Sequence, residues 1–387
     1  MIIRPDAVVL PGGKMQSGLE ICIEDSRIAE IRPWRSAERN EIGLLLTPAF
    51  VNAHSHFEYY DLMGRIPDLD YWRWIRELTR IKPSREMETV QQGALDCAFA
   101  NAATGIAAVG EWSDWPVSAV AMTAARLDGR IFQEIITLNE SDSEEEKVAA
   151  CVVKAMQASR TTNLPVHPTP HATYTTSFSV LQESGCSSQP QSIHACETEH
   201  ENQFFLHGEG VIADLYHEMG IEFELLGVRA LEFLDLAGVV RKGTQLVHCC
   251  AVDADDIEII ATRGAAVAHC PRSNRALGCP PAPIAQMIRA GITVGLGTDS
   301  AASSGAVDMF AEMRAALATS ALVDDPLSAE DVWMMATEDA AASIFLDREW
   351  RIEVGESPDL LLLRHHGGLG EQIARGSPND VVDLIRL

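Results

Sequence analysis

Long apolar runs and a paired-cysteine pattern are both absent from this 387-residue chain. No stretch of about 18 apolar residues without charges occurs, which argues against a transmembrane helix. The nine cysteines are odd in number and form no C-x-x-C pair, so a disulfide framework is not expected. The first residues also lack the long apolar segment of a secretory signal. We therefore expect a cytoplasmic protein with reduced, mostly buried thiols.

Basic residues are few as well: 30 Lys and Arg stand against 56 Asp and Glu, giving a net charge of −26 at pH 7. Such a surface repels phosphate backbones and anionic lipids, so nucleic acid and membrane partners are not expected. Hydrophobic residues make up 47% and charged residues 22%, which are ordinary values for a globular protein. The length allows one large domain or two ordinary ones, at about 100–200 residues each.

Short apolar runs alternate with helical patterns through the middle of the chain, which favours strand–helix units and a parallel sheet. The eight runs are 49–56, 105–112, 130–137, 164–171, 191–197, 244–250, 265–270 and 292–300. Eight such repeats predict an α/β fold of the (β/α)8, or TIM, barrel type. A doubly wound sheet is the alternative, but no G-x-G-x-x-G follows any run. The stretch 205–243 exceeds a plain crossover, and we expect extra helices there near the barrel mouth.

Both ends of the chain have the same sequence pattern, which differs from the alternation of strands and helices in the middle. Short strand-like segments separated by Gly, Asp and Pro fill the first 45 residues and return in the last 40. We therefore expect residues 1–47 and 346–387 to form one small β-sandwich domain, flanking a catalytic barrel over 48–345.

Histidines gather where the predicted strands end, which is where TIM barrels carry their catalytic groups. His54 and His56 end the first run, and their i, i+2 spacing puts both side chains on one face of a strand. His194 and His248 end the fifth and sixth runs, and Asp299 ends the eighth. Three imidazoles and one carboxylate make a plausible Zn²⁺ shell with a place left for water.

Two further residues extend this set. His171 ends the fourth run, and Glu197 lies three residues after His194. A carboxylate beside a metal-bound water could carry its proton to a leaving group. The structural alternative for Glu197 is an acid at a helix N-terminus, a role that Glu199 and Glu201 fit better.

Sequence motifs spread over nearly the whole chain resemble the amidohydrolase superfamily, in particular its deaminase and chlorohydrolase branch. The motifs are PAFVNAHSHFE, GIAAVGEW, HPTPHATYTTS, SIHACETE, LVHCC, AHCPRSNRALG, AGITVGLGTDSAAS and VGESPDLLLL. The resemblance implies a mononuclear site in which His54, His56, His194 and Asp299 hold one divalent metal. It also makes Asp299 the base for the metal-bound water. His248 would orient that water, and Glu197 would be the proton shuttle.

One metal is expected because binuclear members of the superfamily carry a carbamylated Lys at the end of the fourth strand. Here that run ends in His171, and the nearest lysine, Lys154, lies upstream in a helical pattern. Zn²⁺ is the first choice, and Fe²⁺ stays open because imidazole and carboxylate suit both.

The motifs around residues 270–303 are most similar to those of the aminodeoxyfutalosine deaminases of menaquinone biosynthesis. The resemblance thus implies hydrolytic deamination of an aminopurine-like nucleoside or base, with metal-bound hydroxide attacking the amine-bearing ring carbon. Phe57, Tyr59, Tyr60 and Cys279 depart from that pattern and leave the substrate open. The alternatives are adenosine, methylthioadenosine, adenosylhomocysteine, guanine or a pterin, or a C–Cl bond. A catalytically silent assembly protein would be expected to have lost the ligand set.

Five residues are predicted to contact the heterocyclic substrate. His171 matches a substrate-contacting position of the superfamily, and Glu58 could bind an amine or a ribose hydroxyl. Trp72, together with Trp74, could stack on a flat ring from a loop after the first run, although one short helix packed on the barrel rim is the alternative. Arg272 and Asn274 follow the seventh run and could line the pocket. A homodimer would suit this branch.

Overall fold

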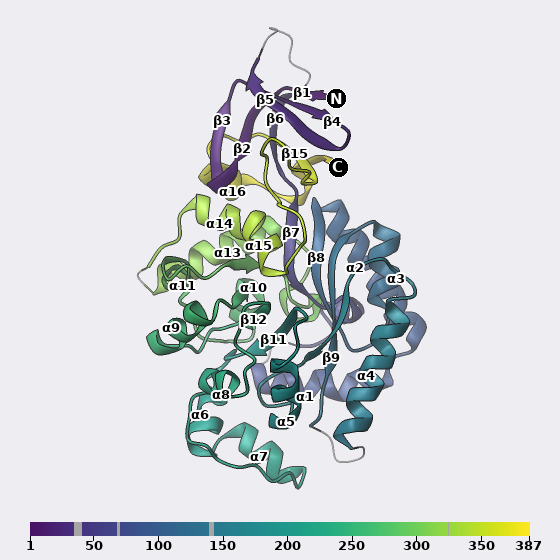
Figure 1. The fold of residues 1–387 in the computed structure, drawn as a ribbon, viewed down its shortest axis with the longest axis vertical. Coiled ribbons are helices and arrows are strands. Elements are labelled where there is room, and N and C mark those ends of the chain that lie inside the picture. The colour runs from purple at the N-terminus through teal and green to yellow at the C-terminus, as the bar shows by residue number, and fades with distance from the viewer. Residues whose placement is uncertain (35–40, 68–69, 139–142, 324) are drawn as a thin grey trace.

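The computed structural model describes residues 1–387 apart from 35–40, 68–69, 139–142 and 324 (Figure 1). All nine cysteines are free, and most of them are buried, as expected. Within the described ranges, no helix is long and apolar enough to cross a membrane.

Eight parallel strands form the barrel, in two half-sheets of four. The first half-sheet contains β7 (Phe50–Ser55), β8 (Ile106–Ser113), β9 (Asp128–Ile135) and β10 (Val166–Pro170). The second contains β11 (Gln191–Ala195), β12 (Thr244–His248), β13 (Ala266–His269) and β14 (Val294–Leu296). Each strand falls within or beside one of the eight apolar runs, so the predicted (β/α)8 fold is confirmed.

The two half-sheets meet at two seams, and each seam is closed at the carboxyl ends of its strands. At one seam Ser55 bridges to Asp299, and the Asp299 N–H donates to the carbonyl of His54 over 2.9 Å. At the other seam Ala172 bridges to His194, whose N–H donates to the carbonyl of His171 over 3.0 Å. The barrel is therefore closed at the end where catalytic groups are expected.

Helices follow the strands and surround the barrel (Figure 1). They are α1 (Tyr71–Ile81), α2 (Met87–Ala103), α3 (Ser118–Ala125), α4 (Glu144–Ala158), α5 (Phe178–Gly185), α9 (Ala254–Arg263), α10 (Pro271–Ala276), α11 (Ile284–Arg289), α12 (Ala301–Ser304), α13 (Met309–Leu322), α14 (Ala329–Met335) and α15 (Glu338–Ser343). The long connection before β12 carries the expected extra helices, α6 (Glu199–His207), α7 (Val211–Glu218) and α8 (Ala230–Leu236).

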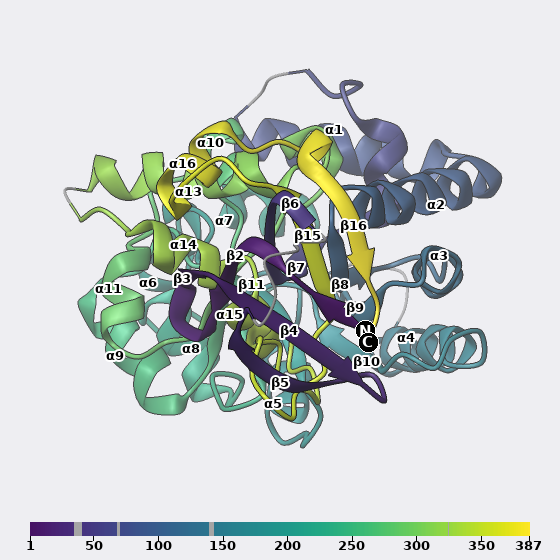
Figure 2. The same cartoon turned by 90° about the horizontal axis from the view of Figure 1, so that it is seen from above.

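Both ends of the chain contribute strands to two small sheets beside the barrel (Figure 2). The five-stranded sheet has the order β16 (Val381–Ile385), β15 (Leu360–Arg364), β6 (Glu41–Pro48), β2 (Pro5–Leu10) and β3 (Lys14–Ser17). The three-stranded sheet has the order β1 (Ile2–Ile3), β4 (Leu19–Glu24) and β5 (Arg27–Pro33). A shared apolar core, including Val8, Ile21 and Leu362, joins them. We keep the boundaries at 47/48 and 345/346 as a proposal.

One small element was not expected. Helix α16 (Leu369–Arg375) separates β15 from β16. Its seven residues contain Gly370 and follow Gly368, and glycine lowers helix propensity by about 1 kcal/mol per residue. This segment is too short for a clear helical period, so the sequence alone could not show it.

Candidate active site

Three histidines from two strands face one another at the carboxyl end of the barrel. His54 lies in β7 and His56 directly follows it, while His194 lies in β11 on the opposite half-sheet. One ring nitrogen of each lies within 4.8 Å of those of the others. The ring centroids of His54 and His194 are 5.1 Å apart. This arrangement could hold a metal ion.

The three imidazoles are neutral, which is the form that binds metal. Burial lowers the pKa of His54 and takes those of His56 and His194 well below the ordinary value. The Nδ1 of His194 contacts the carbonyl oxygen of His171 at 2.9 Å, and this bond leaves Nε2 free for a ligand. Neither ring nitrogen of the fully buried His54 has a hydrogen-bond partner among the described residues.

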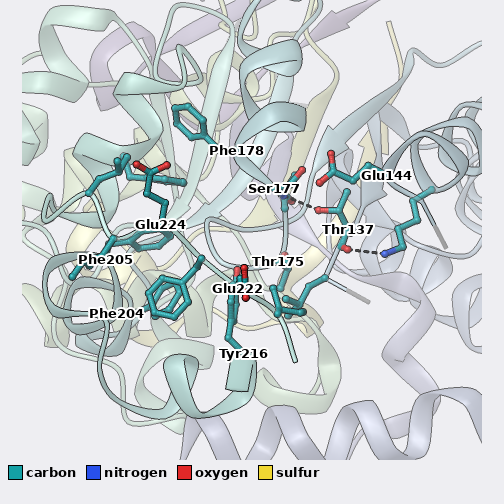
Figure 3. A pocket seen from close by; sticks show the side chains of 18 residues that line it. Thr137, Glu144, Thr175, Ser177, Phe178, Phe204, Phe205, Tyr216, Glu222 and Glu224 are labelled. Carbon is teal, nitrogen blue, oxygen red and sulfur yellow. Dashed lines mark hydrogen bonds between the residues drawn. The ribbon is translucent and has the colours of Figure 1, made fainter. Parts of the chain in front are cut away.

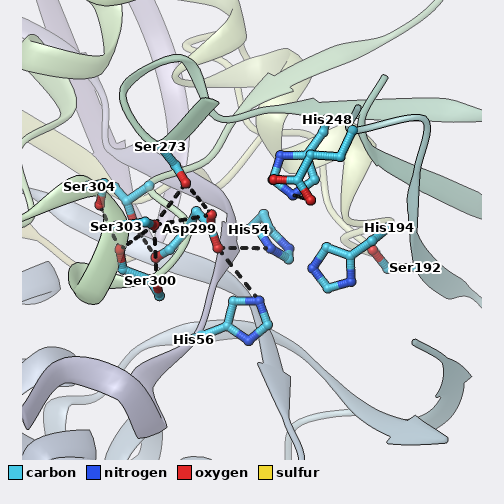
Figure 4. Close-up of polar contacts among 12 residues, drawn as sticks. His54, His56, Ser192, His194, His248, Ser273, Asp299, Ser300, Ser303 and Ser304 are labelled. Carbon is cyan, nitrogen blue, oxygen red and sulfur yellow. Dashed lines mark hydrogen bonds and ion pairs between the residues drawn. The ribbon is translucent and has the colours of Figure 1, made fainter. Parts of the chain in front are cut away.

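Asp299 supplies the carboxylate beside these rings (Figure 4). Its Oδ1 lies 3.6 Å from the Nε2 atoms of both His54 and His56, and its Oδ2 accepts a hydrogen bond from Ser273. Burial opposes ionisation, but the contact with His54 and the nearby imidazoles hold the pKa of Asp299 well below its usual range. Three neutral imidazoles and one ionised carboxylate fit a divalent metal of the zinc class.

Glu197 and His248 complete the polar side of the cavity. The Nε2 of His248 lies 3.5 Å from Oε2 of Glu197. Burial, reinforced by the negative charge of Asp299, raises the pKa of Glu197 well above 4.5. Glu197 precedes α6, and its backbone N–H donates to the Oε1 of Glu201 over 2.7 Å. The predicted helix-terminal role therefore falls to Glu199 and Glu201, both in the first turn of α6.

Backbone strain marks the same strand ends. Cys196, His248, Cys249 and Asp299 have φ values of 51°, 76°, 45° and 56°. Non-glycine residues rarely adopt this left-handed conformation, and its cost persists where the surrounding structure enforces it. Each of these residues follows or ends a barrel strand, so the strain aims the side chains of His248 and Asp299 into the cavity.

The cavity at this site has a volume of about 80 Å³ and is covered by helix α1. One wall is polar and consists of His56, Glu134, His171, His194, Glu197, His248, Asp299 and Ser300. The other is mainly aromatic and aliphatic, from Tyr59, Tyr71, Trp74, Ile75, Leu78, Tyr174 and Leu277. The cavity is small beside the roughly 300–1,000 Å³ of typical ligand pockets.

Of the five residues predicted to contact substrate, His171 lines this cavity. Glu58 is fully buried, and its Oε2 accepts the backbone N–H groups of Asp114 and Trp115. Trp72 packs against Tyr174 on the inner side of α1, with ring centroids 5.4 Å apart.

The last two predicted contacts follow β13. Arg272 pairs with Glu312 at 3.3 Å. Asn274 supports the site indirectly, because its Oδ1 lies 2.8 Å from Nδ1 of His248. A hydrogen bond there fixes the orientation of the imidazole. The other four predicted contacts are therefore not among the residues that line the cavity: Glu58, Trp72, Arg272 and Asn274.

Sequence reasoning missed Glu134 and Tyr71, whereas it considered Trp74 together with Trp72 as a stacking residue. Glu134 interrupts the apolar run 130–137 near its end, and that polar interruption was a usable signal. Tyr71 and Trp74 belong to α1, whose position over the barrel mouth no local pattern indicates. The hydroxyl groups of Tyr71 and Tyr174 are 3.0 Å apart in the cavity wall.

A second and larger cavity, of about 450 Å³, lies beside the first (Figure 3). It is rich in aromatic side chains, namely Phe178, Phe204, Phe205, Tyr216, Phe223 and Phe233. Tyr174 lines the small cavity and the next residue, Thr175, lines the large one. The hydroxyl of Tyr216 donates to the carbonyl of Tyr174 over 2.9 Å, so the cavities flank one loop.

Most of the chain matches the model of a known protein family. Residues 45–383 match the model described as the Amidohydrolase family. The match covers all eight barrel strands together with β15.

Two curated relatives are deaminases of adenosine derivatives. A 5-methylthioadenosine/S-adenosylhomocysteine deaminase of Natronomonas pharaonis is 29% identical over 335 residues, which cover 83% of this chain and 73% of that protein. A 5'-deoxyadenosine deaminase of Methanothermobacter thermautotrophicus is 28% identical over 375 residues, which cover 92% and 82%.

Solved structures share the fold over the whole chain. An adenosine deaminase from Xanthomonas campestris with bound zinc has a TM-score of 0.83 at 24% identity, covering 99% of this chain and 90% of that one. The aminofutalosine deaminase of Helicobacter pylori has a TM-score of 0.81 at 19% identity, covering 99% and 100%. An atrazine chlorohydrolase variant from Arthrobacter aurescens scores 0.81 at 17%, covering 100% and 93%.

Proposed function

Because the chain belongs to the amidohydrolase family, we propose that it is a metal-dependent deaminase that hydrolyses the amino group of an adenosine-like nucleoside. One observation carries this proposal. His56, His194 and Asp299 line one cavity together with Glu197, and a ring nitrogen of His54 lies within 4.8 Å of those of His56 and His194. Burial raises the pKa of Glu197 well above 4.5, which suits this carboxyl to proton donation. The deaminases among the curated relatives support the same reaction.

His54, His56, His194 and Asp299 would hold one divalent cation, with Zn²⁺ as our choice and Fe²⁺ as the alternative. When bound, the cation lowers the pKa of a coordinated water and makes hydroxide accessible at neutral pH. The orphaned nitrogens of the buried His54 favour this assignment, since buried polar atoms without partners are costly.

The protein side chains would then divide the proton transfers between them. Asp299 is ionised and takes a proton from the attacking water, whose oxygen bonds to the amine-bearing ring carbon. Glu197 is protonated and gives its proton to the adjacent ring nitrogen. His248, held by Asn274, faces the same oxygen and stabilises the charge that develops there. Asp299 then returns its proton to the amino group, the proton of the new hydroxyl passes to Glu197, and cleavage of the C–N bond releases ammonia.

We propose 6-amino-6-deoxyfutalosine as the substrate. A catalytic cavity of about 80 Å³ has room for part of a nucleoside, and the aromatic cavity beyond Tyr174 offers a surface for a 5′ substituent. Phe178, Phe204 and Phe205 would pack against an aromatic ring, which aminodeoxyfutalosine carries at that position.

A deamination panel tests the proposal. Ammonia release would be measured with the Zn²⁺-loaded enzyme on aminodeoxyfutalosine, adenosine, methylthioadenosine, adenosylhomocysteine, guanine and a pterin. We expect kcat/KM to be highest for aminodeoxyfutalosine. A higher value for another nucleoside would replace the substrate and keep the reaction. Chloride release from a triazine without deamination would overturn the reaction, and bound metal without any turnover would favour a silent barrel.

A cytoplasmic location and a homodimer stay predictions. Fractionation of cells and the mass of the purified protein in solution would test them.

A further inference from the structure

The second ring nitrogen of His56 has no assigned partner. Nε2 of His56 faces Asp299 at 3.6 Å, on the side where the ligand nitrogens converge. Nδ1 is buried, and among the described residues no group lies within hydrogen-bonding distance of it. The carboxylate Oε1 of Glu134 lies 3.7 Å from this atom.

A histidine that binds metal through one nitrogen almost always donates the N–H of the other to a carboxylate, carbonyl or water, which fixes the ring. His194 already follows this rule through the carbonyl of His171, at 2.9 Å. We propose that Glu134 is the positioning residue for His56, accepting a hydrogen bond from Nδ1–H when a metal occupies the site. The inference rests on the metal site of the proposed function. It requires the distance between Nδ1 of His56 and Oε1 of Glu134, now 3.7 Å, to shorten by about 0.5–1 Å to the ordinary hydrogen-bond range.

Glu134 stands apart from other buried carboxylates nearby. Glu111, on the adjacent strand β8, accepts hydrogen bonds from the backbone N–H of Phe57 at 2.9 Å and from Ser118 at 2.8 Å, and it braces the loop after β7. Glu58 accepts two backbone N–H groups. Glu134 instead lines the catalytic cavity with 5% of its surface exposed, and His56 is the ring beside it.

Two lysines lie near the buried carboxyl group of Glu134. Lys82 and Lys154 both contact Asp114, at 2.7 Å and 2.8 Å. Burial, together with the negative charges of Glu58 and Asp114, raises the pKa of Glu134 to about 8, and the positive charges of Lys82 and Lys154 oppose this rise. Because a carboxyl oxygen accepts a hydrogen bond in either protonation state, the positioning role does not depend on the ionisation of Glu134.

Zn²⁺ binding tests the role directly. The affinity of the full-length protein for Zn²⁺ would be measured by competition with a chromophoric chelator, for the wild type, E134M and E134Q. Methionine keeps the length of the side chain and removes the acceptor, whereas glutamine keeps an acceptor oxygen. We expect E134M to bind Zn²⁺ about 10- to 100-fold more weakly, the range for loss of such a partner, and E134Q to stay within a few-fold of the wild type.

Gln133 provides a matched control on the same strand. It is buried, its side chain points to the other face of β9, and its amide nitrogen donates to the carbonyl of Asp114 over 3.0 Å. Q133M therefore also removes a buried polar group from β9, and it should leave the Zn²⁺ affinity unchanged. An equal loss of affinity in Q133M and E134M would overturn the inference, because it would reveal a general loosening of the strand.

The Nδ1 proton of His56 gives a second readout, which uses the variant E134Q that keeps an acceptor oxygen. In the ¹⁵N-histidine spectrum of the Zn²⁺-loaded wild type, one Nδ1–H besides those of His194 and His248 should be protected from exchange and should shift in E134Q. Absence of that proton, or wild-type Zn²⁺ affinity in E134M, would overturn the inference. An increase in KM alone in E134M would also overturn it, since that result would make Glu134 a substrate contact. The ammonia assay reports separately on the proposed deamination: weakened Zn²⁺ binding in E134M without any deamination would keep this inference and reject that function.

Discussion

At the scale of single residues, two carboxyl groups in one cavity have opposite protonation states. Imidazoles surround Asp299 and lower its pKa, while burial and the charge of Asp299 raise the pKa of Glu197. A base and an acid held side by side at neutral pH is the arrangement that general acid–base catalysis needs. The division of roles thus follows from the surroundings of each carboxyl, and not from its residue type.

Substitution of Glu197 should separate chemistry from metal binding. E197Q keeps the shape of the side chain and removes its proton transfer, so we expect kcat to fall by a factor of about 10² or more. The Zn²⁺ content should stay at the wild-type level. Glu199, exposed in the first turn of α6, gives the control variant E199Q, which should remain fully active. Near-normal turnover in E197Q would refute the shuttle role.

His269 predicts a dependence of stability on pH. Burial lowers its pKa to about 3, and neither ring nitrogen has a hydrogen-bond partner within the described residues. The unfolded chain titrates near 6.5 and therefore binds the proton first, so this residue costs stability as the pH falls below 6.5. With the metal removed by a chelator, the free energy of unfolding of the wild type should fall, relative to H269Q, by about 1.4 kcal/mol per pH unit between 6.5 and 3. Urea titrations at pH 7 and pH 5 measure the difference. Parallel curves for the two proteins would contradict it.

Most of the polar cluster could be predicted from the sequence because its members end apolar runs. His54, His56, His194 and Asp299 each interrupt or end such a run, and the barrel geometry brings those ends together. The exact strand boundaries do not affect that argument. Glu134 follows the same rule, because it interrupts the apolar run 130–137 near its end.

At the scale of elements, helix α1 supplies several of the side chains that line the catalytic cavity. Its N-terminus is capped by the Asp70 side chain, which accepts the N–H of Arg73, and the N–H of Tyr71 donates to the carbonyl of Leu277. Trp72 and Trp74 were expected in a loop that could stack on a flat ring, and the structure places both in this helix, at i and i+2, on different sides of it. Only the packed structure shows that Trp74, and not Trp72, lines the cavity.

The two tryptophans of α1 should therefore have different phenotypes. Trp74 lines the catalytic cavity, so W74L removes a stacking surface and should raise KM for the nucleoside about tenfold, a loss of some 1.4 kcal/mol of binding. Trp72 packs against Tyr71 and Tyr174 inside the cap, so W72L should lower Tm and leave KM within a few-fold. Steady-state kinetics and thermal melts on both variants test the contrast. If W72L raised KM and W74L only lowered Tm, the contrast would be contradicted and Trp72 would be the residue that contacts the substrate.

At the scale of the whole molecule, the four proposed metal ligands lie on both sides of the seams of the barrel. His54 and His56 come from the first half-sheet, while His194 and Asp299 come from the second. Single bridges join the half-sheets at these points, at Ser55–Asp299 and at Ala172–His194. A metal held by all four residues would therefore connect both halves of the barrel where their backbone pairing is sparse.

Zn²⁺ should therefore raise the stability of the native fold, in addition to its proposed role in catalysis. A ligand that binds only the folded chain at 1,000 times its Kd adds about 4 kcal/mol of stability, because unfolding must release it. We expect the metal-free protein to melt several degrees below the Zn²⁺-loaded protein, with the difference growing with free Zn²⁺. H194A removes the ligand from the second half-sheet and should melt at one temperature whether or not Zn²⁺ is present. If Zn²⁺ raised Tm equally in H194A, the stabilising site would lie elsewhere on this acidic chain, and the four residues at the seams would lose their assignment as its ligands.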